Sequence, residues 1–203
     1  MKERWLDFWK RSGAGGDAAL PWGVLSARYA EPHRAYHTLG HIAHCLQELD
    51  SARDLALDPV AVELALWYHD VVYDPRSKDN ERQSADLASA AAVAMGFSAD
   101  RARRVADLIL VSTHQALAVD PDAQLFADID LAILGQPAAV FDQYERQVRV
   151  EYAWVPDELF RAGRSAILKS FLDRPSIYAT PFFGKKYEAA ARRNLSESLL
   201  RWS

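Results

Sequence analysis

Apolar residues recur along most of the chain with the 3.6-residue spacing of helices that bury one face against a core. Residues that favour helix starts precede three such segments: Pro59, Ser98 and Pro156. Alternation with a period of two residues is not sustained, although residues 176–183, "SIYATPFF", could be extended. The pattern therefore predicts an all-α fold.

The length and composition favour a single domain. The chain has 203 residues, a mass of 22.8 kDa and 50 % hydrophobic residues, which is enough apolar surface for one sizeable core. Repeats, low-complexity tracts and linker-like stretches are absent from the sequence. We therefore expect residues 1–203 to form one compact helical bundle without an internal boundary.

Charge and cysteine content exclude several classes of partner. The formal net charge is −4, and the Lys and Arg residues are scattered, so a polynucleotide-binding face is not expected. The single cysteine, Cys45, excludes an internal disulfide. The sequence also lacks a signal-peptide pattern and an apolar run long enough to span a bilayer. These features predict a cytoplasmic protein with no membrane partner.

Three of the six histidines lie close together in "RAYHTLGHIAHCLQELD", residues 34–50. His37, His41 and His44 are spaced four and three residues apart, which brings them near one stripe of a helix that starts around Thr38. The stretch is not the metalloprotease motif H-E-x-x-H, because Thr38 and not a glutamate follows the first histidine. Its spacing alone is equally compatible with a cluster of partly solvated surface histidines.

A second stretch, "LALWYHDVVYD" at residues 64–74, contains His69 and Asp70 within an otherwise apolar and aromatic helix. Burying a carboxylate costs several kcal/mol, roughly, unless it is paired or binds a cation. Lys and Arg are absent within a helical turn of Asp70, so a bound metal ion would offset this cost. The alternative is a histidine that packs between helices and an aspartate that caps a helix end.

A third stretch, "LFADIDLAILG" at residues 125–135, offers two carboxylates two positions apart. On a helix they lie on nearly opposite faces, so only one is expected to point inward. Asp130 has apolar residues at positions −4, +3 and +4, whereas Asp128 has Gln124 at −4. We therefore predict that Asp130 is the buried member of the pair.

The order of His41, His69-Asp70 and Asp130 resembles the H…HD…D pattern of the HD-domain superfamily of metal-dependent phosphohydrolases. The likeness is closest to stand-alone bacterial members, and it covers roughly residues 25–200. The segments that carry it are "YHTLGHI", "WYHDVVYD", "DNERQSA", "FADIDLAILG" and "EYAWVPD". The resemblance implies an HD-type helical bundle.

The resemblance also assigns roles to individual residues. It implies that His41, His69, Asp70 and Asp130 bind the metal and that Asp70 is also catalytic. "YHTLGHI" is similar to the Y-H-N-x-x-H stretch of cyclic-nucleotide phosphodiesterases, but it has Thr38 in place of Asn. That likeness makes His37 the candidate acid for the leaving oxygen. If Asp70 bridges two ions, His114 is the candidate ligand of the second; its alternative role is a helix-end histidine.

Two imidazoles and two carboxylates suit Mn, Fe, Co, Ni or Zn, and suit Mg less well. We expect one or two such ions and the hydrolysis of a small phosphoester, such as a nucleotide or a related phosphometabolite, by a metal-activated water. Two alternatives remain from the sequence. One is an HD-type di-iron oxygenase, and the other is a non-catalytic metal- or ligand-binding module.

The polar segment "YDPRSKDNERQSA", residues 73–85, directly follows the His69-Asp70 pair. Lys78, Asn80 and Arg82 are therefore candidates for holding a phosphate or a base at the mouth of the site. The alternative is that Asp79 or Asn80 caps the following helix. Tyr152 and Trp154 are similarly ambiguous between stacking on a nucleobase and packing in the core.

Overall fold

The computed structural model describes residues 1–113 and 119–202, and every regular element in that part of the chain is helical. The first six α-helices are α1 (Lys2–Arg11), α2 (Ala19–Arg28), α3 (Leu39–Ala52), α4 (Pro59–Tyr68), α5 (Asn80–Ala94) and α6 (Ala99–Leu110). The remaining four are α7 (Pro121–Asp130), α8 (Ala138–Glu151), α9 (Asp157–Leu172) and α10 (Pro181–Trp202). Short 3-10 helices are η1 (Arg53–Leu55), η2 (Val111–Thr113) and η3 (Leu131–Gly135). The predicted all-α fold is confirmed.

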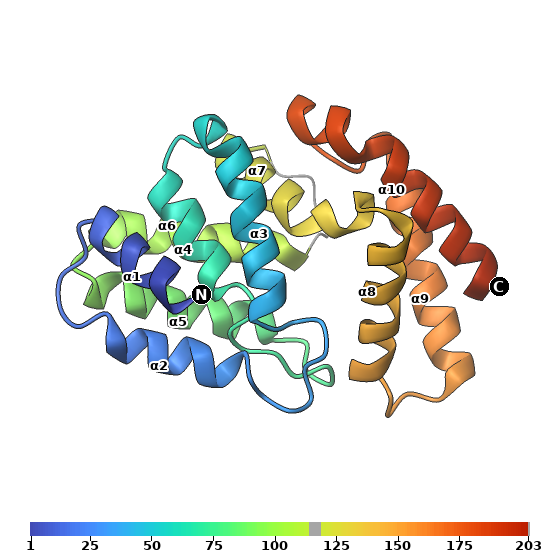
Figure 1. The fold of residues 1–203 in the computed structure, drawn as a ribbon, viewed down its shortest axis with the longest axis horizontal. Helices are drawn as coiled ribbons and strands as arrows, with labels where there is room; N and C mark the ends of the chain where they lie inside the picture. Colours follow the sequence, from blue (N-terminus) through green and yellow to red (C-terminus); the bar gives the residue numbers. More distant parts are fainter. Residues whose placement is uncertain (114–118, 203) are drawn as a thin grey trace.

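The helices form two groups joined by α7 and η3. Helices α1 to α6 lie on one side of the molecule and α8 to α10 on the other, with α7 and η3 running between them (Figure 1). In the first group α5 packs along α6, and α4 packs against α3, α5 and α6. In the second group α10 packs against α9 and η3. The two groups therefore meet where α7 passes into η3.

Helix α4 is the central helix of the first group, because eight of its ten residues are buried. Pro59 occupies its first turn, as predicted, and the Asp58 carboxylate accepts a hydrogen bond from the Ala61 N–H. One buried residue is Glu63, which pairs with Arg11 at 3.2 Å and with Arg53 at 2.6 Å. These two cations compensate a carboxylate that is otherwise costly to bury.

Other helix starts also agree with the sequence. Thr38 is the N-cap of α3, and its side chain accepts a hydrogen bond from the Gly40 N–H. Ser98 caps α6 in the same way through the Arg101 N–H, and Pro156 immediately precedes α9. Because these signals are local, they place helix starts without knowledge of the tertiary fold.

The prediction that His69 and Asp70 lie within a helix is wrong, because α4 ends at Tyr68. Arg34 lies in the segment before α3, and its guanidinium is buried. It forms hydrogen bonds with carbonyl groups just beyond the end of α4. It donates hydrogen bonds to the carbonyls of Asp70 (2.6 Å) and Val71 (3.1 Å), and to that of His37 (3.0 Å). Arg34 thus joins the two segments that carry candidate site residues.

The segment at residues 176–183, for which the sequence allowed extended backbone, contains no strand. Residues 176–180 are irregular, and α10 begins at Pro181. Across the described helices, none combines the length and apolarity needed to cross a membrane.

Candidate functional site

The structure brings together all four predicted metal ligands. His41 lies in the first turn of α3, His69 and Asp70 follow α4, and Asp130 is the last residue of α7. His41 Nε2 lies 3.0 Å from His69 Nε2, 3.4 Å from Asp70 Oδ2 and 3.2 Å from Asp130 Oδ1. His69 Nε2 lies 3.0 Å from Asp70 Oδ2 and 3.5 Å from Asp130 Oδ1. Two ring nitrogens and two carboxylate oxygens therefore converge on one point.

These spacings match those of ligands around one ion. Transition-metal bonds to imidazole nitrogen or carboxylate oxygen are about 2.0–2.2 Å long, so neighbouring ligand atoms at 90–110° lie about 3.0–3.5 Å apart. The five distances that involve a histidine nitrogen all fall in that range. The cluster could therefore hold a metal ion.

The surroundings of the two histidines orient their rings. His69 Nδ1 lies 3.0 Å from the Leu66 carbonyl, which accepts the Nδ1 proton and directs Nε2 toward the cluster. The Phe126 ring meets the His69 ring edge-on at 5.8 Å, and the Tyr36 ring lies 4.8 Å from the His41 ring. Both imidazoles are nearly fully buried, so packing and a backbone hydrogen bond restrict their movement.

Cys45 is a neighbour of the cluster that the sequence interpretation missed as a ligand. Its Sγ lies 3.7 Å from both ring nitrogens of His41, and together with His69 and Asp130 these residues form a group that could hold a metal ion. The sequence could have indicated it, because Cys45 lies one helical turn after His41 and therefore on the same face of α3. Burial, reinforced by the Asp130 and Asp70 charges, raises the pKa of the Cys45 thiol well above its usual value. A bound metal ion itself deprotonates a coordinating thiol, so Cys45 and Asp70 are both candidates for the fourth ligand.

The cluster is strongly coupled electrostatically. Burial acts to raise the pKa of Asp70, but the imidazoles of His69, His37 and His41 outweigh it and hold that pKa well below the usual range. Burial acts to lower the pKa of His69, but Asp70 and Asp130 outweigh it and raise that pKa well above normal. A metal ion would take the place of the imidazole proton, so binding is expected to release protons.

The prediction that Asp130 is the buried member of the aspartate pair is wrong in one respect. Asp128 is only 1 % exposed, because its carboxylate accepts hydrogen bonds from the N–H groups of Ala179 (2.8 Å) and Thr180 (2.7 Å) and from the Thr180 hydroxyl (2.6 Å). These donors lie just before α10. Helical periodicity could not predict them, because it describes only neighbours within the same helix. Asp128 therefore anchors α10, whereas Asp130 joins the candidate metal cluster.

His37 lies outside α3, immediately before the Thr38 N-cap, and is held by a glutamate that the sequence interpretation missed. Its Nδ1 lies 2.7 Å from Glu151 Oε2. Glu151 Oε1 accepts the N–H groups of residues 35–37, and the Tyr73 hydroxyl donates to Oε2 at 2.8 Å. Burial acts to lower the pKa of His37, but Asp70 and Glu151 outweigh it and raise that pKa. At Glu151 burial acts to raise the pKa, but His37 and the backbone N–H donors outweigh it and lower the pKa of Glu151 to about 2.

A cavity of about 300 Å³ opens beside the cluster. Its walls include Asp70, Asp130 and His37, and the aromatic rings of Tyr36, Tyr73, Tyr144 and Tyr152. The cationic side chain on its wall is Arg164, whose Nε donates to Glu145 Oε1 at 3.0 Å and whose Nη2 donates to the Tyr144 hydroxyl at 2.9 Å. Arg164 was not predicted, although Phe160 and Leu168 at −4 and +4 mark its place on the apolar face of α9.

The three predicted substrate-binding residues lie in different surroundings. Asn80 lines the cavity, but its side chain bonds to the backbone of Asp74, with distances of 3.1 Å and 2.8 Å. Lys78 is exposed, and the exposed Arg82 pairs with Asp86 at 3.4 Å. Among the described residues, the cavity wall includes neither Lys78 nor Arg82. Asp79 occupies the N-cap position of α5, but its side chain makes no capping hydrogen bond.

His44, the third histidine of the first stretch, is not brought into the cluster. His44 lies one turn beyond His41, with its Nε2 3.7 Å from Glu48 Oε1, and burial together with the His41 charge lowers its pKa. His114, the candidate for a second ion, lies outside the described residues. Tyr152 lines the cavity, whereas Trp154 is 48 % exposed and stacks against Tyr152 at 6.4 Å.

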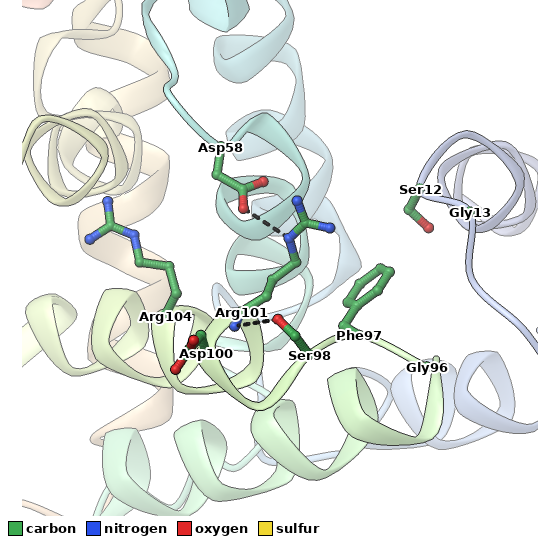
Figure 2. Close-up of a pocket in the computed structure, with 9 residues that line it drawn as sticks. All are labelled: Ser12, Gly13, Asp58, Gly96, Phe97, Ser98, Asp100, Arg101 and Arg104. Carbon is green, nitrogen blue, oxygen red and sulfur yellow. Dashed lines mark hydrogen bonds and ion pairs between the residues drawn. The ribbon is translucent and has the colours of Figure 1, made fainter.

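A second hollow, of about 660 Å³, lies between the end of α1, the start of α4 and the turn from α5 to α6 (Figure 2). Arg101 Nε donates to Asp58 Oδ2 at 2.9 Å across it, and Arg104 pairs with Asp120 and Asp122. We call it the distal hollow, since it shares no lining residue with the cavity beside the cluster.

Comparisons of the chain with known protein families, with curated proteins and with solved structures find no match. The functional interpretation therefore depends on the geometry of these residues and on the resemblance in their order along the chain.

Proposed function

We propose that this protein is a metal-dependent phosphohydrolase of the HD type that acts on a small phosphoester. The observation that carries the proposal is the convergence of His41, His69, Asp70 and Asp130, with 3.0–3.5 Å between their ligand atoms, beside a cavity of about 300 Å³. The mixed nitrogen and oxygen donors suit Mn, Fe, Co, Ni or Zn better than Mg.

A bound ion would supply an activated water and would polarise a phosphoryl oxygen. Hydrolysis then adds water across the ester P–O bond: the water gives up one proton and its oxygen bonds to phosphorus, the ester P–O bond breaks, and the departing oxygen gains one proton, so that protons are neither consumed nor produced by these steps. The proximity of Asp70 and Asp130 to the cavity wall supports a role for both carboxylates in orienting the incoming water.

His37 is the proposed donor of the proton to the departing oxygen. Its Nδ1 is engaged by Glu151, and its ring lines the same cavity as the cluster, which directs the other ring nitrogen, Nε2, to substrate. Against the effect of burial, Asp70 and Glu151 raise the pKa of His37, which favours the protonated ring that a proton donor requires. Glu151 is then a positioning residue, since its contacts fix the ring and sustain its charge.

Arg164 is the proposed partner of the phosphoryl oxygens. It lines the cavity, and its guanidinium is held by Glu145 and the Tyr144 hydroxyl. A guanidinium can donate several hydrogen bonds in one plane, so one that is held by two partners can still bind an anion. This role replaces the one that the sequence interpretation gave to Lys78 and Arg82.

The decisive experiment is elemental analysis of protein purified without added metal, followed by assays of phosphomonoesters and phosphodiesters with each divalent ion. We expect one or two ions per chain, and hydrolysis that a chelator abolishes and one added ion restores. An ion with no hydrolysis of any ester would favour the binding-module alternative. Two irons per chain with an oxygen-dependent reaction would favour the oxygenase, and a metal-free protein would contradict the proposal altogether.

A further inference from the structure

A groove of about 370 Å³ adjoins the cavity that carries the candidate metal cluster. It runs between α8 and α9, and five residues line both spaces: His37, Tyr144, Tyr152, Arg164 and Ile167. Because these residues form a common wall, a ligand seated at the cluster can extend into the groove. We call this second space the α8–α9 groove.

The chemistry of the α8–α9 groove changes along its length. The polar groups belong to the shared wall, where His37, Arg164 and the two tyrosines stand. The rest of the lining consists of Val148, Val155, Leu159, Phe160 and Gly163. A polar end joined to an apolar end is the arrangement of a site for a ligand with one charged group and one apolar group.

Two of the apolar lining residues are unusually exposed. Leu159 is 65 % exposed and Ile167 is 48 % exposed, and both lie on α9 beside Gly163. Gly163 adds to the space, because a Cβ at this position would meet no atom within 4 Å. Exposed apolar side chains around a hollow that leads to a reactive centre are typical of ligand-binding grooves.

The position of His37 indicates which part of a substrate occupies the groove. His37 stands on the wall between the two spaces, and in the proposed reaction it protonates the oxygen that leaves phosphorus. That oxygen must therefore lie at the boundary, with the phosphoryl group toward the cluster and the carbon skeleton toward the groove. The groove side chains beyond the boundary offer no hydrogen bonds to a sugar hydroxyl or a nucleobase edge.

We propose that the α8–α9 groove binds the leaving group of the substrate and that this group is apolar, so that the substrate class is phosphate esters of alkyl or aryl alcohols. The inference rests on the proposed function. It replaces the nucleotides expected from the sequence with phosphate esters that have an apolar leaving group. Its occupant is the organic part of the substrate, because the groove is continuous with the cavity where the phosphoryl group would lie.

The test compares hexyl phosphate with ethyl phosphate as substrates, and hexylphosphonate with methylphosphonate as ligands in calorimetric titrations of the metal-loaded protein. We expect the longer chain to raise kcat/KM and affinity by roughly 10- to 100-fold, which corresponds to burial of about two to three of the added methylenes at about 0.8 kcal/mol each. Equal values for long and short chains would overturn the inference. The phosphonate titrations measure binding in the groove even if no ester is hydrolysed. Failure of the inference and failure of the proposed function are therefore distinguishable.

A filling variant locates the effect. Gly163→Leu places a side chain in the groove, and we expect it to abolish the preference for the hexyl compounds while metal content and turnover of ethyl phosphate stay unchanged. Gly23→Leu is the matched control, because Gly23 is also an exposed, mid-helix glycine with open space around it and lies on α2, away from the groove. A preference that survives Gly163→Leu, or that Gly23→Leu abolishes equally, would contradict the assignment.

A second variant guards against misfolding of the first. Leu159→Ser removes an exposed apolar wall residue without adding charge, and we expect it to reduce the hexyl preference severalfold while circular dichroism stays unchanged. Light scattering of all variants tests the rival occupant, a second copy of the chain. If Gly163→Leu changes the mass in solution and leaves the ester preference intact, the groove is an interface between copies and the inference is overturned.

Discussion

The distal hollow and the cavity beside the metal cluster differ in how their charged groups are paired. In the distal hollow each arginine faces a carboxylate, as Arg101 faces Asp58 (Figure 2). At the cluster the carboxylates of Asp70 and Asp130 face imidazole nitrogens within 3.0–3.5 Å. The pairs of the first kind do not bring several ligand atoms to one point, whereas the second arrangement brings two nitrogens and two oxygens together and could hold a metal ion. The larger hollow is thus the weaker candidate, because convergent ligand atoms indicate function better than volume does.

The largest expected effect comes from removing one ligand of the cluster. Asp130→Asn should lower metal affinity by more than about 100-fold, because losing a direct ligand exceeds the 10- to 100-fold effect of losing a group that only orients one. Hydrolysis should fall with metal content. Elemental analysis after dialysis against a weak chelator measures the loss.

Asp128→Asn is the matched control two residues away. It should keep the metal and lower the free energy of unfolding by about 1–3 kcal/mol, because the Asp128 carboxylate holds the backbone before α10. Equal metal contents in the two variants would contradict the division of roles between these aspartates.

The next effect separates the proposed acid from the ligands. His37→Ala should leave the metal content unchanged and reduce kcat by about 10²- to 10⁴-fold for esters of ordinary alcohols. A nitrophenyl ester needs little help from an acid, so the deficit should shrink on that substrate. For His41→Ala the deficit should persist on both substrates. If the His37→Ala variant lost the metal ion, His37 would be a ligand and the proposed role as acid would be contradicted.

The contacts of Glu151 predict a dependence of stability on pH. The pKa of its carboxyl is lowered to about 2 in the folded protein, so its stabilising contribution is present above the unfolded value of about 4.5 and is lost as pH falls toward 2. Glu151→Gln should be less stable than the wild type by about 1–3 kcal/mol at pH 7. The gap should narrow between pH 5 and pH 2, because the Glu151 carboxylate takes up a proton over that range. Urea unfolding at several pH values measures it, and a gap that stays constant would refute the assignment.

The part of this site that could be predicted depended on local signals and on the order of a few residues. Helix caps such as Thr38 and Ser98 act over three residues, so the sequence alone locates them. His41, His69-Asp70 and Asp130 could be grouped only because their order resembles a known pattern. Helical periodicity by itself ranked Asp130 above Asp128 in burial, which the structure reverses.

The parts that could not be predicted depend on contacts between distant segments. Glu151 binds the backbone of residues 35–37 across more than a hundred positions, and Asp128 binds donors about fifty positions ahead. Arg34 donates from a separate segment to carbonyls that follow α4. Asp128 and Glu151 each lie three residues after an apolar helix position, Leu125 and Val148, which signals burial but does not identify the partner.

The smallest expected effect is that of a substitution in the distal hollow, which the comparison ranked as the weaker candidate. Arg101→Ala removes a partly exposed ion pair from the distal hollow, in which Arg101 is 40 % and Asp58 28 % exposed. Such pairs contribute about 0–1 kcal/mol, so the free energy of unfolding should change by less than about 1 kcal/mol. Metal content and hydrolysis should match the wild type, because the distal hollow and the cavity beside the cluster share no lining residue. Metal analysis and ester assays alongside urea unfolding check this. A clear loss of turnover with the fold intact would show that the distal hollow takes part in the function, and pairing of charges would then no longer distinguish the two hollows.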